Sequence, residues 1–441
     1  MKHIITEMTF EDRDEYLRCD IAHNIIKLIT SKIDVSPMII DGDWGTGKSE
    51  FCHKLIHLIG KETDSYKVVY IDAFNEDHTD APILTLLAAI VALLPQEERS
   101  TLIKKALPAI RFGLKTTLKA GANWLLKQNT EQLAEDFQEA IKDSSNAVID
   151  GTIEALLEDH IESDKNIRAL KEALTEISKK TPMVIFIDEL DRCKPSFAIS
   201  ILENIKHVFE VDNVHFVLVT NTKQLEASIH HIYGHSVDAK RYLDKFIRFT
   251  VNLPAYFKPD SHNNVLSSSL HWFTTASKSE TLSKIDNPTS EFISSLIKLK
   301  GLSLREVETL ARHVEIYQTI SPNPITDDIV PAYKFLYVIG IFICCFDKEN
   351  AIQISLNNFN KDSIFKTFNI NRIPYGTANY PLPIYILLNA LIQESGGNDT
   401  PTEEIRIKWI DYVNNLSNGS YNRPENMIKI VANTIDTLQM K

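Results

Sequence analysis

A glycine-rich segment near the N-terminus carries the residues with the clearest chemistry in the chain. It reads G-D-W-G-T-G-K-S and lies between an apolar stretch expected to form a strand and an amphipathic stretch expected to form a helix. Glycines let successive backbone N–H groups point at one anion, and the helix adds the positive end of its dipole. We expect this phosphate loop, residues 42–49, to bind a nucleoside triphosphate, with Lys48 at the β- and γ-phosphates and Ser49 on Mg²⁺. The residues predicted to surround the phosphates are Gly42, Asp43, Trp44, Gly45, Thr46, Gly47, Lys48, Ser49 and Glu50.

A carboxylate is needed to complete a metal site beside such a loop. Asp188 ends the apolar stretch P-M-V-I-F-I-D, residues 182–188, which is typical of a strand covered on both faces. We expect its carboxylate to meet Mg²⁺ opposite Ser49. Glu189 follows directly and is predicted to polarise the attacking water. The alternative is that both carboxylates only cap the next helix.

A further polar residue follows a later strand. Asn221 comes after the apolar stretch 214–220, and we expect it either to contact the γ-phosphate and water or to form an ordinary turn at the strand end. The four residues from Asn221 to Gln224 read N-T-K-Q, which does not match the N-K-x-D signature of guanine selection. The sequence therefore favours ATP over GTP.

Three arginines are candidates to stabilise the transferred phosphate. Arg241 and Arg248, with Lys245 between them, share one face if this segment is helical, by their i, i+4, i+7 spacing. That face would approach phosphate in the same chain or across a subunit interface, and a solvated basic face is the alternative. Arg305 is predicted to begin a later helix and would reach back from a helical lid.

Composition limits the classes of protein to consider. The chain has 441 residues, of which 44% are hydrophobic and 24% charged, as expected for a globular protein of two or three domains. A net charge of −12 argues against a broad basic face for duplex DNA, without excluding a local groove. The five cysteines form no C-x-x-C pair, and the N-terminus has no signal-peptide pattern. Since no apolar stretch reaches 18 residues either, we expect a cytoplasmic protein.

Apolar stretches that alternate with helical patterns indicate the fold class. Helical spacing predicts helices over 11–35, 49–59, 82–94 and 199–209, with Gly60 ending the second. Strands are expected between them, at 37–41, 66–72, 182–188, 214–220 and 249–253. This alternation predicts an α/β fold with a doubly wound parallel sheet. After Pro254 the strand signals fade. The predicted parts are a core over 1–260 with a helical insertion at about 95–180, a small helical lid over 261–321, and a C-terminal helical domain of unknown role over 322–441.

Together these motifs resemble the KAP family of P-loop NTPases, over residues 10–320. Four segments carry the resemblance: G-D-W-G-T-G-K-S at 42–49, V-V-Y-I-D-A-F-N-E-D at 68–77, I-F-I-D-E-L-D-R-C at 185–193, and Y-L-D-K-F-I-R-F-T-V-N-L-P at 242–254. The family commonly has two adjacent aspartates at the metal strand, whereas this chain has Glu189 second, which keeps a carboxylate.

The resemblance implies a P-loop NTPase fold, a helical insertion between the two Walker motifs, and Mg²⁺-dependent ATP hydrolysis. It also implies bacterial members in phage exclusion and animal members in membrane-associated signalling. We therefore expect an ATPase that acts as a switch or motor in a multi-protein assembly of anti-phage defence, as a homo-oligomer or with a separate effector. Two alternatives stay open. One is a nucleotide-binding scaffold with little turnover, and the other is a membrane-surface protein that uses the stretch 102–126.

Overall fold

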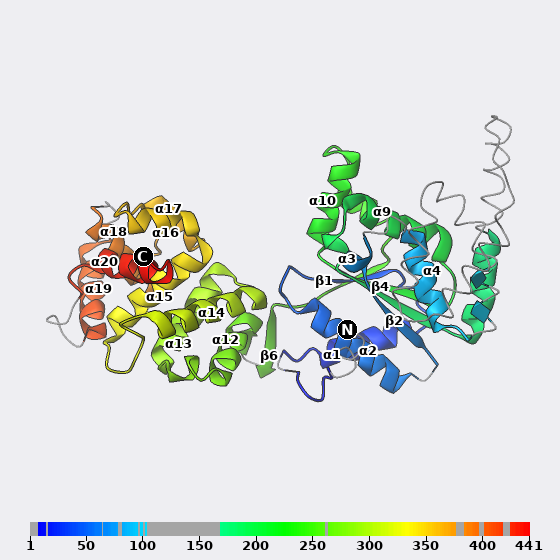
Figure 1. Ribbon diagram of the computed structural model, residues 1–441, viewed down its shortest axis with the longest axis horizontal. Coiled ribbons are helices and arrows are strands. Elements are labelled where there is room, and N and C mark those ends of the chain that lie inside the picture. The colour runs from blue at the N-terminus through cyan, green and yellow to red at the C-terminus, as the bar shows by residue number, and fades with distance from the viewer. Residues whose placement is uncertain are drawn as a thin grey trace. The chain divides into compact units, whose positions relative to one another are not determined.

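The protein forms two compact units (Figure 1). The sheet unit comprises Met1–Asp43 and Gly47–Pro254, and the helical unit comprises Ala255–Lys441 together with Trp44–Thr46. The computed structural model describes residues 8–14, 16–63, 65–77, 82–95, 98–99, 102–103, 168–260, 263–375, 383–396, 401–417 and 424–441.

The sheet unit is built on five parallel strands in the order β2-β3-β4-β1-β5. This arrangement confirms the predicted doubly wound parallel sheet. β4 lies between β1 and β3, so the carboxyl ends of these three strands meet at one edge of the sheet. The strands are β1 Met38–Asp41, β2 Lys67–Asp72, β3 Met183–Asp188, β4 Val214–Thr220 and β5 Phe249–Asn252.

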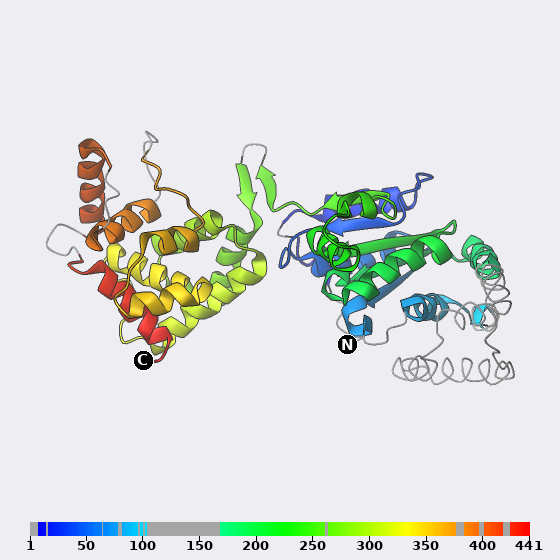
Figure 2. The ribbon, with the colours of Figure 1, turned by 90° about the horizontal axis from the view of Figure 1, so that it is seen from above.

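Helices cover both faces of this sheet (Figures 1 and 2). Alternate residues of β3 belong to two separate apolar clusters, with Phe186 in one and Ile185 and Ile187 in the other. The burial of β3 on both faces accounts for its unbroken apolar run. One face packs against α1 (Cys19–Ile29) and α2 (Lys48–Glu62). The other face packs against α4 (Pro82–Leu93), α9 (Pro195–Asn204), α10 (Thr222–Tyr233) and α11 (Ala239–Leu243).

Several helix ends differ from those predicted. The first helix begins at Cys19 rather than residue 11, because the carboxylate of Asp14 accepts hydrogen bonds from the backbone N–H groups of Arg18 and Cys19. The predicted stop at Gly60 is wrong, since α2 continues to Glu62. Short elements complete the unit: α3 Ala73–Glu76, the 3₁₀ turn Leu190–Arg192, and a π-helical turn Ile205–Phe209 that follows α9.

The predicted insertion at 95–180 lies mostly outside the described residues. Its last part, residues 168–180, is helical, and Leu170, Leu174 and Ile177 pack into the apolar cluster of the sheet unit. Within the described part of the chain, no helix combines the length and hydropathy that a membrane crossing requires.

The helical unit begins with two strands that the sequence analysis missed. β6 (Tyr256–Asp260) and β7 (Asn263–Leu266) pair antiparallel, so the expectation of helices alone from residue 261 onward is wrong. Nine α-helices of the described chain follow: α12 Ser267–Lys278, α13 Asn287–Lys300, α14 Leu304–Ile320, α15 Pro331–Phe346, α16 Lys348–Ser355, α17 Lys361–Thr367, α18 Pro383–Glu394, α19 Glu403–Leu416 and α20 Met427–Leu438.

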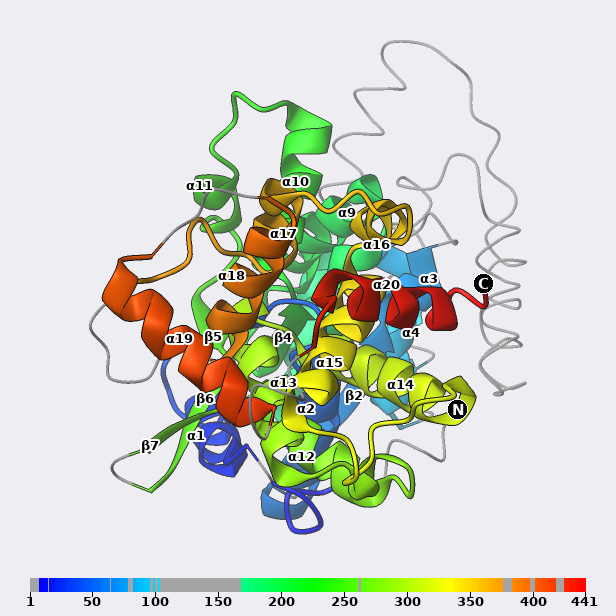
Figure 3. The same ribbon diagram turned by 90° about the vertical axis from the view of Figure 1, so that its left-hand side faces the viewer.

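The apolar helix α15 is the centre of the helical unit, with α13, α14, α16 and α20 packed around it (Figure 3). Its burial confirms the prediction that the apolar run from Phe335 to Phe346 is a buried helix. A single apolar cluster extends from Trp272 to Ile435 and includes residues on both sides of position 321. The division into a lid and a C-terminal domain at this position stays a prediction.

Candidate nucleotide-binding site

The phosphate loop joins the end of β1 to the start of α2. Gly45 and Gly47 have φ values of 75° and 82°, a left-handed conformation that side chains with a Cβ adopt only at a cost. The loop therefore turns sharply and α2 begins directly at Lys48, without a side-chain cap on its first N–H groups. Such an uncapped helix start after a tight glycine turn is suited to an anion.

Lys48 is held inside this loop. Its side chain is buried, and Nζ donates to the carbonyl oxygens of Gly42 at 2.6 Å and of Asp43 at 3.1 Å. Burial lowers the pKa of Lys48, while the nearby carboxylates of Asp191 and Asp188 oppose that shift. The site thus contains a cationic group whose present partners are neutral carbonyls.

Asp188 ends β3 and is 1% exposed. Its Oδ1 accepts from the backbone N–H of Glu189 at 2.7 Å, its Oδ2 accepts from the hydroxyl of Tyr70 at 3.0 Å, and Ser49 also hydrogen-bonds the carboxylate. Burial raises the pKa of Asp188, and these hydrogen bonds oppose the shift. A hydroxyl and a carboxylate in contact form the hard oxygen donor set that suits Mg²⁺.

Glu189 follows in a left-handed conformation, with φ 59° and ψ 26°. Its Oε1 lies 3.1 Å from a guanidinium nitrogen of Arg192. Burial raises the pKa of Glu189, and the charge of Arg192 acts in the opposite direction. At the start of the next helix, α9, the backbone N–H of Lys194 donates to Oδ2 of Asp77 at 3.0 Å, so the alternative that Asp188 and Glu189 serve only as caps of this helix is wrong.

Asn221 directly follows β4, the strand between the loop strand and the Asp188 strand. Its side-chain oxygen accepts from the backbone N–H of Lys223 and caps α10, while Nδ2 lies 3.4 Å from Oδ1 of Asp43. Lys223 also pairs with Asp43, with Nζ 3.0 Å from Oδ1. Asn221 therefore both forms the turn at the strand end and reaches the start of the phosphate loop.

A profile described as the KAP family P-loop domain matches residues 18–321. The chain belongs to the KAP family of P-loop NTPases. No curated protein matches its sequence.

Two solved structures are similar to the chain at low identity. The Aeropyrum pernix ORC2 protein, solved as ADPNP and ADP complexes, aligns with a TM-score of 0.35 and 13% identity over 96% of this chain and 95% of that chain. The structure of C. elegans PCH-2 aligns with a TM-score of 0.30 and 14% identity, over 71% of this chain and 66% of that chain.

Glu50, Trp44 and Thr46, the other predicted loop residues with side chains, differ in their contacts and exposure. Oε1 of Glu50 forms ion pairs with Arg13 at 2.5 Å and with Lys54 at 2.7 Å. These pairs give the carboxylate of Glu50 a structural role. Trp44 is an exposed aromatic residue, and Thr46 is half-buried.

The three candidate arginines belong to three different parts of the fold. Helix α11 ends at Leu243, so the prediction that Arg241 and Arg248 share one helix face is wrong. The side chain of Arg241 is 86% exposed, and its Nε lies 3.8 Å from Oδ2 of Asp238. Arg248 precedes β5, and β5 begins beside the first residue of β1, at the edge of the sheet opposite the loop. Arg305 belongs to the first turn of α14, where the neighbouring Leu304 donates its backbone N–H to the oxygen of Gly45 in the phosphate loop at 2.9 Å.

Arg248 is paired at that opposite edge. Its Nε lies 3.3 Å from Oδ2 of Asp34, and a terminal nitrogen lies 2.5 Å from Oε1 of Glu210. In its own chain Arg248 therefore contacts these two carboxylates, away from the carboxyl ends of the strands.

Tyr70 is a site residue that the sequence analysis missed. It lies in the second strand, and only the pairing of β2 with β3 brings its hydroxyl to Asp188. The linear sequence does not specify which strands are neighbours. The sequence holds one signal for this role. Tyr70 is an aromatic residue with a hydroxyl group, in a strand whose other residues are Lys, Val, Ile and the final Asp72.

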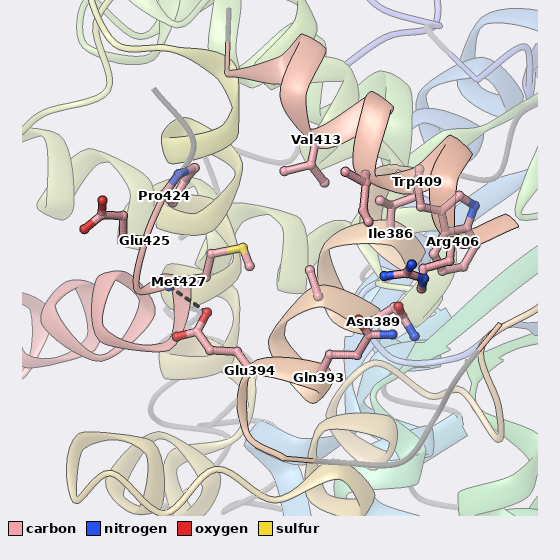
Figure 4. A pocket seen from close by; sticks show the side chains of 12 residues that line it. Ile386, Asn389, Gln393, Glu394, Arg406, Trp409, Val413, Pro424, Glu425 and Met427 are labelled. Atoms are coloured by element: carbon pink, nitrogen blue, oxygen red, sulfur yellow. Dashed lines mark hydrogen bonds between the residues drawn. The ribbon is translucent and has the colours of Figure 1, made fainter. Parts of the chain in front are cut away.

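A separate pocket of about 530 Å³ lies in the helical unit, between α18, α19 and α20 (Figure 4). The carboxylate of Glu394 accepts there from the backbone N–H groups of Met427 and Ile428, at 2.9 Å and 3.1 Å, and so caps α20. Arg406 pairs with Glu403 on its own helix. Glu394 and Arg406, two charged side chains that line the pocket, therefore stabilise helices.

Proposed function

We propose that this KAP-family protein hydrolyses ATP with Mg²⁺ and uses the hydrolysis as a switch in a multi-protein assembly. The observation that supports the proposal is the meeting of Lys48 and Ser49, at the start of α2, with the carboxylate of Asp188. Glu189 follows at the same edge of the sheet. A cation, a hydroxyl and two carboxylates around an anion-binding turn are the groups that phosphoryl transfer to water requires.

Lys48 would bind the β- and γ-phosphates. Its Nζ would exchange the carbonyl oxygens of Gly42 and Asp43 for phosphate oxygens, because an ammonium binds an anion more strongly than a neutral carbonyl. The hydroxyl of Ser49 and the carboxylate of Asp188 would hold Mg²⁺. When bound, Mg²⁺ supplies positive charge to the phosphate oxygens.

Glu189 would act on the attacking water. Its carboxylate would orient the water and accept a proton as the water oxygen bonds to the γ-phosphorus, while the bond from that phosphorus to the bridging oxygen breaks. The ion pair with Arg192 holds the carboxylate in the present conformation, so it must rearrange before Glu189 reaches the water. Asn221 would contact the γ-phosphate from the end of β4.

The assembly part of the proposal rests on the exposed arginine and on the family. Arg241 would stabilise the transferred phosphate across a subunit interface, since its side chain extends into solvent within its own chain. Arg248 and Arg305 are the alternative arginines.

We further propose a role in anti-phage defence, which a plating assay tests by comparing cells that express the wild type with cells that express Lys48→Ala. Equal plaque counts would contradict this role.

Phosphate release from ATP by the purified protein tests the enzymatic proposal. We expect Mg²⁺-dependent phosphate release by the wild type and loss of that release in both Lys48→Ala and Glu189→Gln, with nucleotide binding retained only in Glu189→Gln.

The second candidate function is a nucleotide-binding scaffold with little turnover, which the Glu189–Arg192 ion pair favours. Equal, slow release by all three proteins, with nucleotide bound, would support the scaffold instead. The membrane-surface alternative rests on residues 102–126, most of which lie outside the described chain.

A further inference from the structure

Tyr70 joins the candidate metal site to the neighbouring strand. It pairs with Phe186 across β2 and β3, so it faces the same side of the sheet as Asp188, two residues further along. Its hydroxyl donates to Oδ2 of Asp188 at 3.0 Å. This contact links two strands through side chains at the edge of the sheet where the phosphate loop begins.

Helix α2 packs against the same tyrosine. His53 lies one turn after Ser49 on α2, and its ring centroid is 4.7 Å from that of Tyr70, with the planes tilted by 48°. Ser49 hydrogen-bonds Asp188 directly. The helix that begins at the phosphate loop therefore holds both the carboxylate and the tyrosine that donates to it.

The hydrogen bonds of Asp188 indicate what this tyrosine does. An ionised carboxylate offers about four lone-pair sites, and three donors use three of them: the N–H of Glu189 at Oδ1, the hydroxyl of Tyr70 at Oδ2, and the hydroxyl of Ser49. If Ser49 turned its oxygen to a cation, it would no longer donate to Asp188. The backbone N–H and Tyr70 would then remain to orient a carboxylate that is almost entirely buried.

We propose that Tyr70 is a positioning residue that holds the carboxylate of Asp188 in the orientation that binds Mg²⁺. This inference rests on the proposed function, because it needs Ser49 and Asp188 to be the Mg²⁺ ligands. A partner that orients a metal ligand commonly changes metal affinity by about 10–100-fold when it is removed. Removing the hydroxyl alone, with the ring kept, isolates this role.

Mg²⁺ titrations of fluorescent ATP-analogue binding test the proposal in Tyr70→Phe and in a matched control, Tyr66→Phe. Tyr66 directly precedes β2, and its hydroxyl donates to the backbone oxygen of Ile29 at 3.5 Å. We expect Tyr70→Phe to raise the Mg²⁺ concentration at half-saturation by about 10-fold or more. Analogue affinity in EDTA and the melting temperature should match those of Tyr66→Phe, since a merely structural role would change them as well.

The outcomes separate this inference from the function on which it rests. If Tyr70→Phe and Tyr66→Phe need the same Mg²⁺ concentration as the wild type, the positioning role is overturned while nucleotide binding stands. If the wild type binds the analogue but releases no phosphate, only the proposed hydrolysis fails, and the Mg²⁺ shift in Tyr70→Phe still supports the positioning role. If the wild type binds no analogue with or without Mg²⁺, both proposals are overturned.

Discussion

The ammonium of Lys48 lies 2.6 Å from the carbonyl oxygen of Gly42, six residues earlier in the chain. This hydrogen bond closes the phosphate loop on its own lysine. Together with the carbonyl of Asp43, it supplies acceptors to a buried cation whose pKa burial already lowers. A phosphate that enters the loop therefore replaces an existing partner rather than filling a gap. The loop can be ordered before nucleotide binds, which reduces the entropy lost on binding.

Lys48→Ala is expected to weaken nucleotide binding by about 10–100-fold, since a hydrogen bond to a charged group contributes about 1.5–3 kcal/mol. Titration with a fluorescent ATP analogue measures the change. Lys61→Ala is the matched control on the same helix, because Lys61 pairs with Glu11 on the surface. Equal affinities in the two variants would show that Lys48 does not bind phosphate.

Glu189→Gln should reduce phosphate release by about 10²–10⁴-fold without weakening nucleotide binding, because the amide cannot accept the proton of the attacking water. Single-turnover release and equilibrium binding, measured on the same preparation, separate the two effects. A variant that binds nucleotide normally and hydrolyses it at the wild-type rate would remove Glu189 from the proposed mechanism.

Arg192→Ala is expected to move the acid limb of the turnover–pH profile to higher pH. A general base is active when deprotonated, and burial raises the pKa of Glu189 above its ordinary value of 4.5 while Arg192 lowers it. Without the guanidinium, Glu189 binds its proton more tightly, so activity falls at a higher pH as the solution is acidified. Arg192→Lys, which keeps the charge, should shift the limb less. An unchanged limb in Arg192→Ala would argue against Glu189 as the base.

The sequence predicted β1, β3 and β4 well because each is largely a buried apolar run. The predicted stretch 182–188 differs by one residue from β3, Met183–Asp188, and 214–220 coincides with β4. The order of the strands depends on long-range pairing, so the neighbours of Asp188 could not be predicted. The contact with Tyr70 was missed for that reason. The strands β6 (Y-F-K-P-D) and β7 (N-N-V-L) were missed because they are short and neither is an apolar run.

The packing of α15 in the helical unit can be tested at Gly340, with Gly60 on α2 of the sheet unit as the control. A Cβ added to Gly340 on α15 would lie 2.8 Å from the Cβ of Thr434 and 3.0 Å from the backbone oxygen of Val431, both on α20. Gly340→Ala should therefore destabilise the protein by about 1–3 kcal/mol, against the usual gain for alanine in a helix. The control is Gly60→Ala, where an added Cβ meets nothing within 4 Å and the helix should gain about 0.5–1 kcal/mol. Urea unfolding measures both, and a stabilised Gly340→Ala would contradict the close packing of α15 and α20.

Mixed oligomers test whether Arg241 acts across an interface. Arg241→Ala alone should lose about 10³-fold in phosphate release, as for other arginines that stabilise the transferred phosphate. Mixing it with Lys48→Ala should recover activity, because an intact loop on one subunit then faces an intact arginine on the next. Lys240→Ala, an exposed neighbour, is the control for the single variant. Recovery would be absent if Arg241 acted within its own chain or had no role.

A structure of the protein with a non-hydrolysable ATP analogue and Mg²⁺ tests the central claim most directly. We predict that Nζ of Lys48 leaves Gly42 for the β- and γ-phosphates, and that Ser49 and Asp188 lie on either side of the metal ion. An analogue bound elsewhere, with the Lys48–Gly42 hydrogen bond intact and Asp188 still bonded to Ser49, would contradict the account.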